Sequence, residues 1–394
     1  MMSREAPIRV ATVIAAPHWG GLQTVVVRTE AALRANGVAR TVVIPPNPAI
    51  RARFEAAGCD VVEAPLRRLR RPPNWTANWR YALNFRSGIV RLCQIYKTIG
   101  ADVVEVAGLH HLQPAFAAKR AGLPLVWAAH STAIPQPLRT MTGFFVSAYA
   151  DALLCSGATL ARRHGGLSKA KTVSFRAPID VSEFKPMAAD RAYARASMNV
   201  GDQDCVVGAL GSFGWQKNHG LLVQVAKSLS GKNLNLKFRI CGNAVDADAS
   251  YFERSVLDPI NSYGLARNGY VEVIPQTLPP SSLLNGFDIF ALPSRAEGLS
   301  LVTGEAAATG LPLLGADVGG VPDLIEPGVN GYLLNCDDVA AWAARIEELA
   351  ADPERRKKLG AASRERALKT LGINCSAQDH ERAYRLPICS NMKN

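Results

Sequence analysis

The chain has 394 residues, of which 48% are hydrophobic and 20% charged, and its 45 Lys and Arg against 33 Asp and Glu give a formal net charge of +12. This length favours two domains of roughly 150 to 200 residues each. No apolar run approaches the roughly 20 residues that span a bilayer, which excludes a transmembrane helix and predicts a soluble protein.

The eight cysteines are scattered and form no CxxC pair. That distribution argues against a zinc site and against a disulfide framework, and it fits the reducing cytoplasm. The apolar run near the N-terminus is short for a signal peptide and leads into Pro17-His18-Trp19-Gly20-Gly21 rather than a cleavage site. We interpret it as a first buried strand.

The N-terminal half alternates short β-branched runs with amphipathic stretches, the pattern of βαβ units. The runs that predict strands span residues 8–15, 40–45, 101–107 and 123–129. Glycines at the positions expected for helix C-caps close the intervening segments, at Gly37, Gly58, Gly100 and Gly122. A parallel sheet covered by helices is therefore expected.

The pattern lapses around 176–204, which is rich in Pro, Asp and Gly, and then resumes. Strands are expected near 205–211, 237–242, 269–274, 287–293, 311–316 and 331–334. The predicted fold is α/β with two doubly wound domains, residues 1–185 and 186–370, followed by a tail at 371–394 whose helix packs back on the first domain. Ligands of such sheets bind beyond the carboxyl ends of the strands, so a central cleft is the expected site.

Residues 51–97 hold ten basic residues against three acidic ones. We expect an anionic membrane surface or an anionic acceptor to contact this stretch, in particular Arg67, Arg68, Arg70 and Arg71. Trp75, Trp79, Tyr81 and Phe85 add an aromatic composition typical of membrane interfaces. The alternative is a solvated basic face; nucleic acid is not expected, because no recognition motif accompanies the charge.

The segment from Glu297 to Glu305 carries the clearest chemical signal. It follows a predicted strand with a tight loop and a helix start, where unpaired N–H groups and the helix dipole favour a diphosphate near residues 298–301. Glu305 lies about five residues into the helix, roughly 8 Å further along. The two carboxylates thus suit hydroxyls on either side of a diphosphate, as in a nucleotide sugar, and the alternative is two solvated glutamates.

Lys217 stands at the corresponding place after the strand 205–211, just before a helix. A cation there can neutralise charge on a departing nucleoside diphosphate. The alternative, a surface lysine at a helix start, is disfavoured by the helix dipole. No Walker loop and no dinucleotide GxGxxG motif is present.

Three further positions are candidates for ligand contact. Gly20 and Gly21 let a backbone approach a ligand, or else form an ordinary strand-to-helix turn. His130 follows a predicted strand and is a candidate for hydrogen bonds with sugar hydroxyls, against the alternative of a structural histidine. We discount the triplet Asp246-Ala247-Asp248 as a metal motif, and we expect neither a metal nor another cofactor.

Together these elements resemble glycosyltransferase family 4, a group of retaining enzymes with the GT-B architecture. The family's E-x7-E motif is matched by Glu297 and Glu305 within PSRAEGLSLVTGEAAATGLPLLGADVGGVPDLIEPGVNGYLL, and HWGGLQ, AAHST, APIDVSEFKP and GSFGWQKNHGLL follow in the family's order. The resemblance covers about residues 8–370. It implies a metal-independent hexosyltransferase that uses a UDP- or GDP-linked sugar and a saccharide or lipid-linked acceptor.

Carried over by position, the resemblance implies a catalytic set of His130, Lys217 and Glu297. It also implies donor contacts at Gly20, Gly21, Ser212, Lys217, Ile274, Gln276, Glu297, Gly298, Leu299, Ser300 and Glu305. Glu305 would hold the ribose, and the nucleobase would lie near Ile274, Pro275 and Gln276. Many members carry Arg where this chain has Ser212, so one phosphate-binding cation is missing, unless Arg295 replaces it.

The expected setting is bacterial cell-surface polysaccharide or glycolipid synthesis in the cytoplasm, with peripheral binding to the inner face of the plasma membrane. Two alternatives stay open. A sugar-nucleotide epimerase shares the architecture but needs acid and base groups that the sequence does not show. A non-catalytic sugar-nucleotide-binding protein would be consistent with Ser212.

Overall fold

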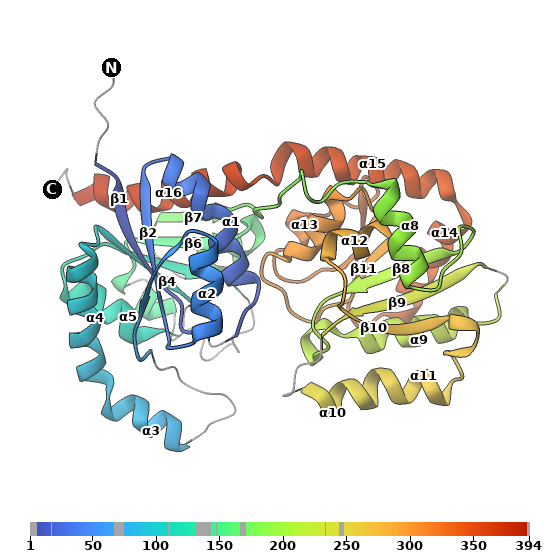
Figure 1. The fold of residues 1–394 in the computed structure, drawn as a ribbon, viewed down its shortest axis with the longest axis horizontal. Coiled ribbons are helices and arrows are strands. Elements are labelled where there is room, and N and C mark those ends of the chain that lie inside the picture. The colour runs from blue at the N-terminus through green and yellow to red at the C-terminus, as the bar shows by residue number, and fades with distance from the viewer. Residues whose placement is uncertain are drawn as a thin grey trace. The chain divides into compact units, whose positions relative to one another are not determined.

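The computed structural model describes residues 6–16, 18–66, 75–108, 111–130, 143–146, 148–165, 171–232, 234–243 and 248–391. The chain divides into two compact units (Figure 1). Unit 1 comprises Met1–Pro178 with Ile373–Asn394, and unit 2 comprises Ile179–Gly372. The four expected helix-closing glycines all have positive φ, between 65° and 78°, a conformation that favours glycine.

Unit 1 contains a seven-stranded parallel sheet in the order β3-β2-β1-β4-β5-β6-β7. Its strands are β1 (Ile8–Val13), β2 (Val38–Ile44), β3 (Asp60–Glu63), β4 (Val103–Ala107), β5 (Leu125–Ala129), β6 (Ala152–Ser156) and β7 (Lys171–Phe175). Its helices include α1 (Gly21–Ala35), α2 (Pro48–Ala56), α3 (Trp75–Leu83), α4 (Phe85–Ile99), α5 (Leu112–Arg120), α7 (Ala158–Gly165) and α16 (Ile373–Asn391). The strand order reverses between β1 and β4, which is the topological switch point of this sheet.

Unit 2 contains a six-stranded parallel sheet in the order β10-β9-β8-β11-β12-β13. Its strands are β8 (Cys205–Leu210), β9 (Leu236–Gly242), β10 (Val271–Pro275), β11 (Ile289–Leu292), β12 (Leu313–Ala316) and β13 (Gly331–Leu334). Its helices are α8 (Ala188–Ser197), α9 (His219–Leu229), α10 (Ala249–Phe252), α11 (Asp258–Ser262), α12 (Pro280–Asn285), α13 (Leu301–Ala308), α14 (Val339–Ala351) and α15 (Pro353–Thr370). Here the switch point lies between β8 and β11.

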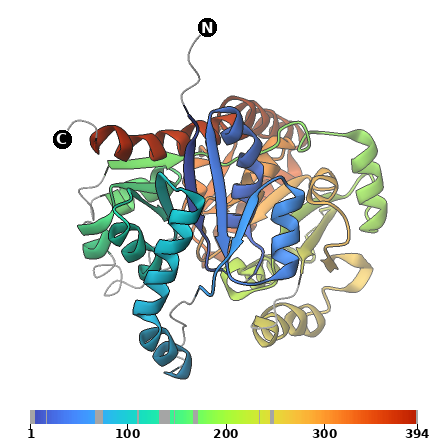
Figure 2. The same ribbon diagram turned by 60° about the vertical axis from the view of Figure 1, so that its left-hand side comes forward.

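The central strands are buried on both faces, which explains why they appear in the sequence as continuous apolar runs. Every residue of β4, β5, β6, β8, β11 and β12 is buried. Both sheets are parallel and flanked by helices, so the predicted fold class, two doubly wound Rossmann-like units, is confirmed (Figures 1 and 2).

The helical segment over residues 250–264 is divided in the structure. It consists of α10, a π-helical turn at Glu253–Leu257 and α11. Pro259 is the second residue of α11, and because it has no N–H it cannot donate to the carbonyl of Ser255. That missing bond explains why regular α-helix does not continue through this segment.

The last helix of the chain, α16, belongs to unit 1 and packs against α1, β6 and β7. Asp379 of this helix accepts from Arg176, which follows β7, at 2.8 Å. Within the described part of the chain, no helix combines the length and the apolar character needed to cross a bilayer.

Candidate functional site

The two strands at the switch point of unit 2 lead into the two loops that carry the predicted donor residues. The loop after β8 holds Ser212 and Lys217, and the loop after β11 holds Glu297. Because β8 and β11 are neighbours, their carboxyl ends open at one edge of the sheet, where ligands of such sheets bind. Residues 80 positions apart in sequence therefore meet.

Lys217 and Glu297 form an ion pair with 2.8 Å between Nζ and Oε1. The hydroxyl of Ser294, which is fully buried, donates to the same oxygen at 2.6 Å. The side chains of Lys217 and Glu297 are only 17% and 6% exposed. Charges so far removed from water interact more strongly than surface charges, both with each other and with any anion that reaches them.

Hydrogen bonds hold the two loops together. The N–H of Arg295 donates to the carbonyl of Gln216 at 2.8 Å, and the side-chain amide of Gln216 donates to the carbonyl of Ala296 at 2.7 Å. Asn218, a buried residue with φ of 54°, donates to the carbonyl of Pro293 at 3.1 Å. The two loops that carry the ion pair are therefore linked to each other by hydrogen bonds and are not independent.

The helix start expected near residues 298–301 is that of α13. Ser300 precedes its first residue with φ of 52°, and the N–H groups of Thr303 and Gly304 return to the Ser300 carbonyl at 3.1 and 3.3 Å. The first N–H groups of an α-helix have no partner inside it, and with the helix dipole they favour an anion. Glu305, the fifth residue of α13, is buried one turn further along.

The loop after β12 contacts the backbone of Glu297 and Gly298. The N–H of Gly320 donates to the carbonyl of Gly298 at 2.7 Å. A Cβ on Gly319 would lie 2.0 Å from the carbonyl oxygen of Glu297, and Gly319 has φ of 56°. The pair Gly319-Gly320 lies within the family motif, but the sequence alone assigned it no role. In the structure it permits close approach of two backbones.

The guanidinium of Arg295, the cation expected to replace the missing arginine, is held by contacts with Trp215 and Tyr251. It donates to the carbonyl of Trp215 at 3.1 Å and to the hydroxyl of Tyr251 at 2.8 Å. It also lies over the rings of these two residues, at 5.4 and 5.9 Å from their centroids. Ser212 itself is exposed, so Lys217 carries the positive charge of this loop next to Glu297.

The residues expected near a nucleobase end the strand β10. Ile274 belongs to this strand and Gln276 follows it, both half-buried. The N–H of Gln276 donates to the carbonyl of Gly242 at the end of β9, at 2.9 Å. These residues thus also lie at the carboxyl edge of the unit 2 sheet.

In unit 1, Gly20 and Gly21 lie where β1 leads into α1. Gly20 precedes the first helical residue, Gly21, and its N–H donates to the side-chain oxygen of Gln23 at 3.0 Å. The Gln23 amide in turn donates to the carbonyl of His18 at 2.8 Å. This helix start after a switch-point strand is of the type that can face an anion.

His130 directly follows β5. Its Nδ1 lies 2.9 Å from the hydroxyl of Ser156, and its ring packs edge-on against Phe175 at 5.8 Å. Burial lowers the pKa of His130 from 6.5 to about 4, although the Glu105 carboxylate acts in the opposite direction. Nε2 is covered and has no partner among the described residues. At neutral pH the ring is therefore an uncharged hydrogen-bonding group.

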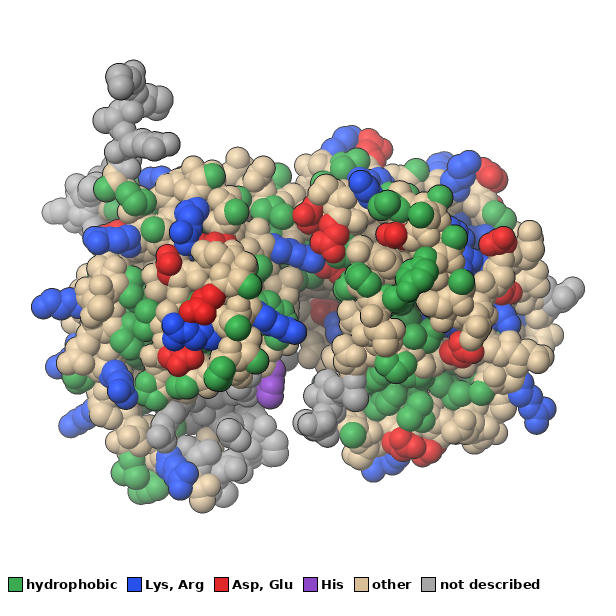
Figure 3. All heavy atoms as spheres, viewed as in Figure 1, with side chains coloured by type: hydrophobic (Ala, Val, Ile, Leu, Met, Phe, Trp, Pro, Cys, Tyr) green, Lys and Arg blue, Asp and Glu red, His purple; other side chains and the backbone are tan. Residues whose placement is uncertain are grey.

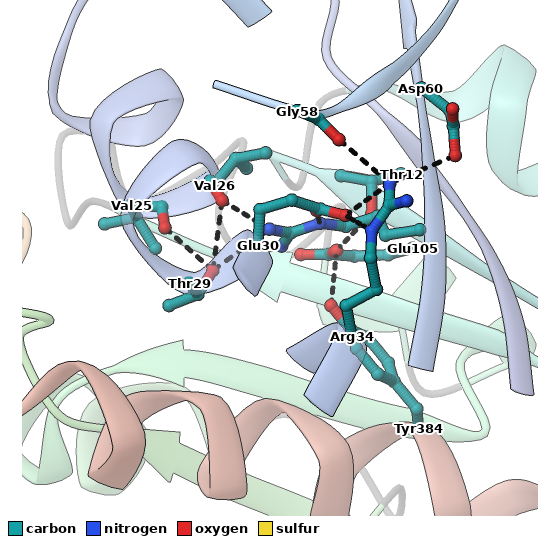
Figure 4. Close-up of polar contacts among 11 residues, drawn as sticks. Thr12, Val25, Val26, Thr29, Glu30, Arg34, Gly58, Asp60, Glu105 and Tyr384 are labelled. Carbon is teal, nitrogen blue, oxygen red and sulfur yellow. Dashed lines mark hydrogen bonds and ion pairs between the residues drawn. The ribbon is translucent and has the colours of Figure 1, made fainter. Parts of the chain in front are cut away.

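A buried polar network lies within unit 1 (Figure 4). Glu105 of β4 accepts from Thr12 of β1 at 2.7 Å and from Tyr384 of α16 at 2.9 Å. Arg40 of β2 pairs with Glu30 of α1 at 3.0 Å and also donates to the carbonyl of Val26. Burial raises the pKa of Tyr384 well above its usual value. This network was not predicted from the sequence. A charged residue inside an otherwise apolar strand, Arg40 in β2 and Glu105 in β4, could have indicated it.

The structure thus groups the predicted residues by unit. In unit 2, the strand-end loops and α13 hold Ser212, Lys217, Glu297, Gly298, Leu299, Ser300 and Glu305. In unit 1, strand ends hold Gly20, Gly21 and His130. Arg67, Arg68, Arg70 and Arg71 lie outside the described residues, as do Asp246 and Ala247.

Comparison with known proteins supports this division. Residues 190–366 match the family described as "Glycosyl transferases group 1", and residues 20–167 match the "Glycosyl transferase 4-like domain". The D-inositol 3-phosphate glycosyltransferase of Actinosynnema mirum is 29% identical over 264 residues, which are 62% of this chain and 62% of that protein. The one of Mycobacterium tuberculosis is 27% identical over 309 residues, 72% of this chain and 62% of that protein. The chain thus spans about three fifths of the length of these relatives.

Solved structures share the fold across nearly the whole chain. Anabaena Alr3699/HepE in complex with UDP and glucose has a TM-score of 0.80 at 16% identity, covering 95% of this chain and 98% of that one. Sucrose-phosphate synthase from Thermosynechococcus elongatus has a TM-score of 0.76 at 18% identity, covering 97% of this chain and 100% of that one. Residues 190–366 thus belong with the group 1 glycosyl transferases, residues 20–167 match a second glycosyl transferase domain, and the fold that both units build is GT-B.

Proposed function

We propose that this protein transfers a hexose from a nucleoside diphosphate sugar to a saccharide or lipid-linked acceptor. The observation that carries the proposal is the Lys217–Glu297 pair, held at the switch point of unit 2 beside the start of α13. Because Alr3699/HepE was solved with UDP and with UDP-glucose, UDP is the favoured nucleotide over GDP. The relatives are named for an inositol phosphate, so the acceptors to be tried include phosphorylated ones.

The proposed donor contacts follow from the charges of unit 2. Lys217 and the first N–H groups of α13 hold the diphosphate, and Glu297 accepts hydrogen bonds from hydroxyls of the transferred sugar. When the donor binds, Lys217 exchanges part of its contact with Glu297 for the diphosphate oxygens. Glu305 accepts from the ribose, and the nucleobase lies near Ile274 and Gln276.

We propose that the configuration at the anomeric carbon is retained. The acceptor hydroxyl attacks C1 on the face from which the diphosphate leaves: the new C1–O bond forms as the C1–O bond to the diphosphate breaks, and a diphosphate oxygen takes the hydroxyl proton. Lys217 and the α13 amides stabilise the negative charge that develops on the leaving group. They take the place of a metal ion, so transfer should continue when divalent cations are chelated.

In unit 1, the proposed contribution is positional. His130 is uncharged at neutral pH because burial lowers its pKa to about 4, so it suits a hydrogen bond with a hydroxyl of the transferred sugar rather than a charge contact. Gly20 and Gly21 are proposed to let a sugar or phosphate approach the start of α1. The proposed setting is bacterial cell-surface polysaccharide or glycolipid synthesis at the cytoplasmic face of the membrane.

A panel of nucleotide sugars tests the proposal. The matched donor should raise the midpoint of thermal unfolding, because a ligand that binds the folded state stabilises it by mass action. That donor is then incubated with acceptors in the presence of EDTA, and NMR of the product reads its anomeric configuration. A new glycoside with retained configuration supports the proposal.

Three results would contradict it. Isomerisation of the donor without acceptor would indicate an epimerase. Binding with neither transfer nor slow donor hydrolysis would indicate a non-catalytic binding protein, as the exposed Ser212 allows. Transfer abolished by EDTA and restored by a divalent cation would contradict metal independence.

A further inference from the structure

The exposed apolar side chains of unit 1 gather in one region of the chain. Among its described residues, the large hydrophobic side chains most open to solvent are Trp79 and Leu83 of α3, Val90 of α4 and Phe144, at 69%, 68%, 46% and 71% exposure. In Figures 1 and 2, α3 extends away from the sheet at the lower end of unit 1. Single exposed apolar residues are ordinary, whereas a cluster marks an interaction surface.

A series of aromatic contacts links α3, α4 and α5 with Phe144. Ring centroids lie 5.5 Å apart for Tyr81 and Phe85, 5.9 Å for Phe85 and Phe116, 6.3 Å for Phe116 and Phe145, and 6.0 Å for Phe145 and Phe144. The series runs from α3 through α4 and α5 to the helical residues that include Phe144. Phe144 thus belongs to the same aromatic cluster as residues of α3, α4 and α5.

Helices α3 and α4 are fixed to α5 where they meet. The side-chain amide of Gln113 in α5 donates to the carbonyls of Asn84 and Phe85, both at 3.0 Å, where α3 meets α4. Gly88 leaves room for that amide, since a Cβ there would lie 1.9 Å from Nε2. The junction of α3 and α4 is therefore anchored to α5.

The charge of the same region has one sign. From position 64 to position 101 the sequence contains seven Arg and one Lys but no Asp or Glu. Arg80, Arg86, Arg91 and Lys97 lie in α3 and α4 and are exposed. In Figure 3, basic and hydrophobic side chains lie next to each other over α3 and α4.

We propose that α3, α4 and Phe144 form a docking face for an anionic lipid bilayer; its members are Trp79, Arg80, Leu83, Arg86, Val90, Arg91 and Phe144. Aromatic and aliphatic side chains beside cations, without acidic neighbours, match the boundary between acyl chains and headgroups. Each cation near an anionic membrane strengthens binding by about fivefold, and the exposed Trp and Phe add apolar burial. The face goes beyond glycosyl transfer, because binding requires neither donor nor acceptor.

Vesicle sedimentation tests the proposal without any substrate. The full chain is mixed with vesicles of phosphatidylcholine alone and with vesicles of phosphatidylcholine and phosphatidylglycerol in equal parts. Wild-type protein should sediment with the anionic vesicles and much less with the neutral ones, and added salt should weaken the binding. Binding to neither kind, or equally to both, would overturn the proposal.

Two double substitutions separate the apolar part from the charged part. Trp79→Ala with Leu83→Ala, and Arg80→Glu with Arg86→Glu, should each weaken binding to the anionic vesicles by about tenfold or more. The matched controls are Tyr193→Ala in α8, whose side chain is 63% exposed, and Lys358→Glu in α15, which is exposed in unit 2. Controls that weaken binding as much as the double variants would overturn the proposal.

A check on folding accompanies each variant. All four substituted residues of the face are exposed, so the midpoint of thermal unfolding should stay near the wild-type value. A double variant that remains folded and still binds anionic vesicles with wild-type affinity overturns the docking face, whatever the outcome for glycosyl transfer.

Discussion

The two units place charge differently at sheets of the same kind. In unit 2 the switch-point strands β8 and β11 lead into loops that bring Lys217 and Glu297 to 2.8 Å at the carboxyl edge. In unit 1 the switch-point strands are β1 and β4, and there Thr12 and Glu105 are partners within the sheet itself. One switch point presents charge at the edge where ligands bind, and the other pairs it inside the fold.

The difference follows from what each group contacts. Lys217 keeps partial exposure, and the loops that carry Lys217 and Glu297 are fixed by backbone hydrogen bonds, which suits binding of a charged ligand with little reorganisation. Glu105 is 2% exposed and accepts from Tyr384 of α16, which joins the last helix of the chain to the sheet. We therefore expect substitutions in the first group to affect turnover and those in the second to affect stability.

The largest expected effect is on turnover, from Lys217→Ala. Loss of the cation that stabilises the departing diphosphate should lower kcat by about 10² to 10³, with a smaller change in KM. Steady-state kinetics with the matched donor measures both. The control is Lys232→Ala, which breaks an exposed ion pair with Glu347 of 2.5 Å and should leave kcat unchanged. An unchanged kcat in Lys217→Ala would remove the role assigned to this lysine.

Acidification should destabilise the protein through buried histidines of both units. Burial, with Lys217 beside it, lowers the pKa of His219 to about 3, and burial lowers that of His130 to about 4. Between pH 6.5 and these values the unfolded chain binds protons that the folded chain does not, so the unfolding free energy falls as the pH falls, by about 1.4 kcal/mol per pH unit for each histidine.

Denaturant unfolding from pH 7 to pH 4.5 measures this dependence. His219→Leu should flatten it by the share of one histidine, while its unit keeps the Lys217–Glu297 pair. An equal slope in wild type and variant would mean that His219 is not the group that resists protonation.

Gly319→Ala tests the frame of Glu297, which we define as the backbone contacts of Gly319 and Gly320 with Glu297 and Gly298. A methyl group there would lie 2.0 Å from the Glu297 carbonyl oxygen, so the loop must move. In addition, φ of 56° disfavours Ala by about 1 to 2 kcal/mol. Gly328→Ala is the matched control, because Gly328 has φ of 79° and nothing within 4 Å of the added Cβ. Both variants should lose stability, and only Gly319→Ala should also lose donor affinity. Equal donor affinities would show that the frame does not position Glu297.

The smallest expected effect is that of Tyr384→Phe in unit 1. Loss of the hydroxyl removes one of two donors to the buried Glu105, which should lower the unfolding free energy by about 1 to 2 kcal/mol while kcat stays near wild type. Tyr96→Phe is the comparison: this buried hydroxyl donates to the neutral carbonyl of Pro114 at 3.3 Å, so the loss should be smaller. Denaturant unfolding ranks the two, and a reversed ranking would contradict the account of the network.

The sequence was sufficient for the fold class because buried parallel strands appear as apolar runs that glycines separate from helices. It also located Lys217 and Glu297 individually, since each follows an expected strand. Their direct ion pair could not be predicted, because the approach of the two side chains depends on the paths of the loops after β8 and β11, which local patterns do not contain.

Other features needed the structure for similar reasons. Arg40 and Glu105 occupy strand positions that local patterns assign to the apolar core, and only the three-dimensional arrangement supplies their partners Glu30 and Tyr384. The contacts of Arg295 also could not be predicted, because its guanidinium is held by the distant residues Tyr251 and Trp215. Except for Arg40 and Glu30, which are ten residues apart, the partners are far apart in sequence.

Calorimetric titration of UDP tests the central claim, that the loops after β8 and β11 form the diphosphate site. Wild-type protein should bind UDP, Lys217→Ala should bind it at least about tenfold more weakly, and Lys232→Ala should bind it like wild type. Equal affinity in wild type and Lys217→Ala would contradict the claim and place the nucleoside diphosphate elsewhere.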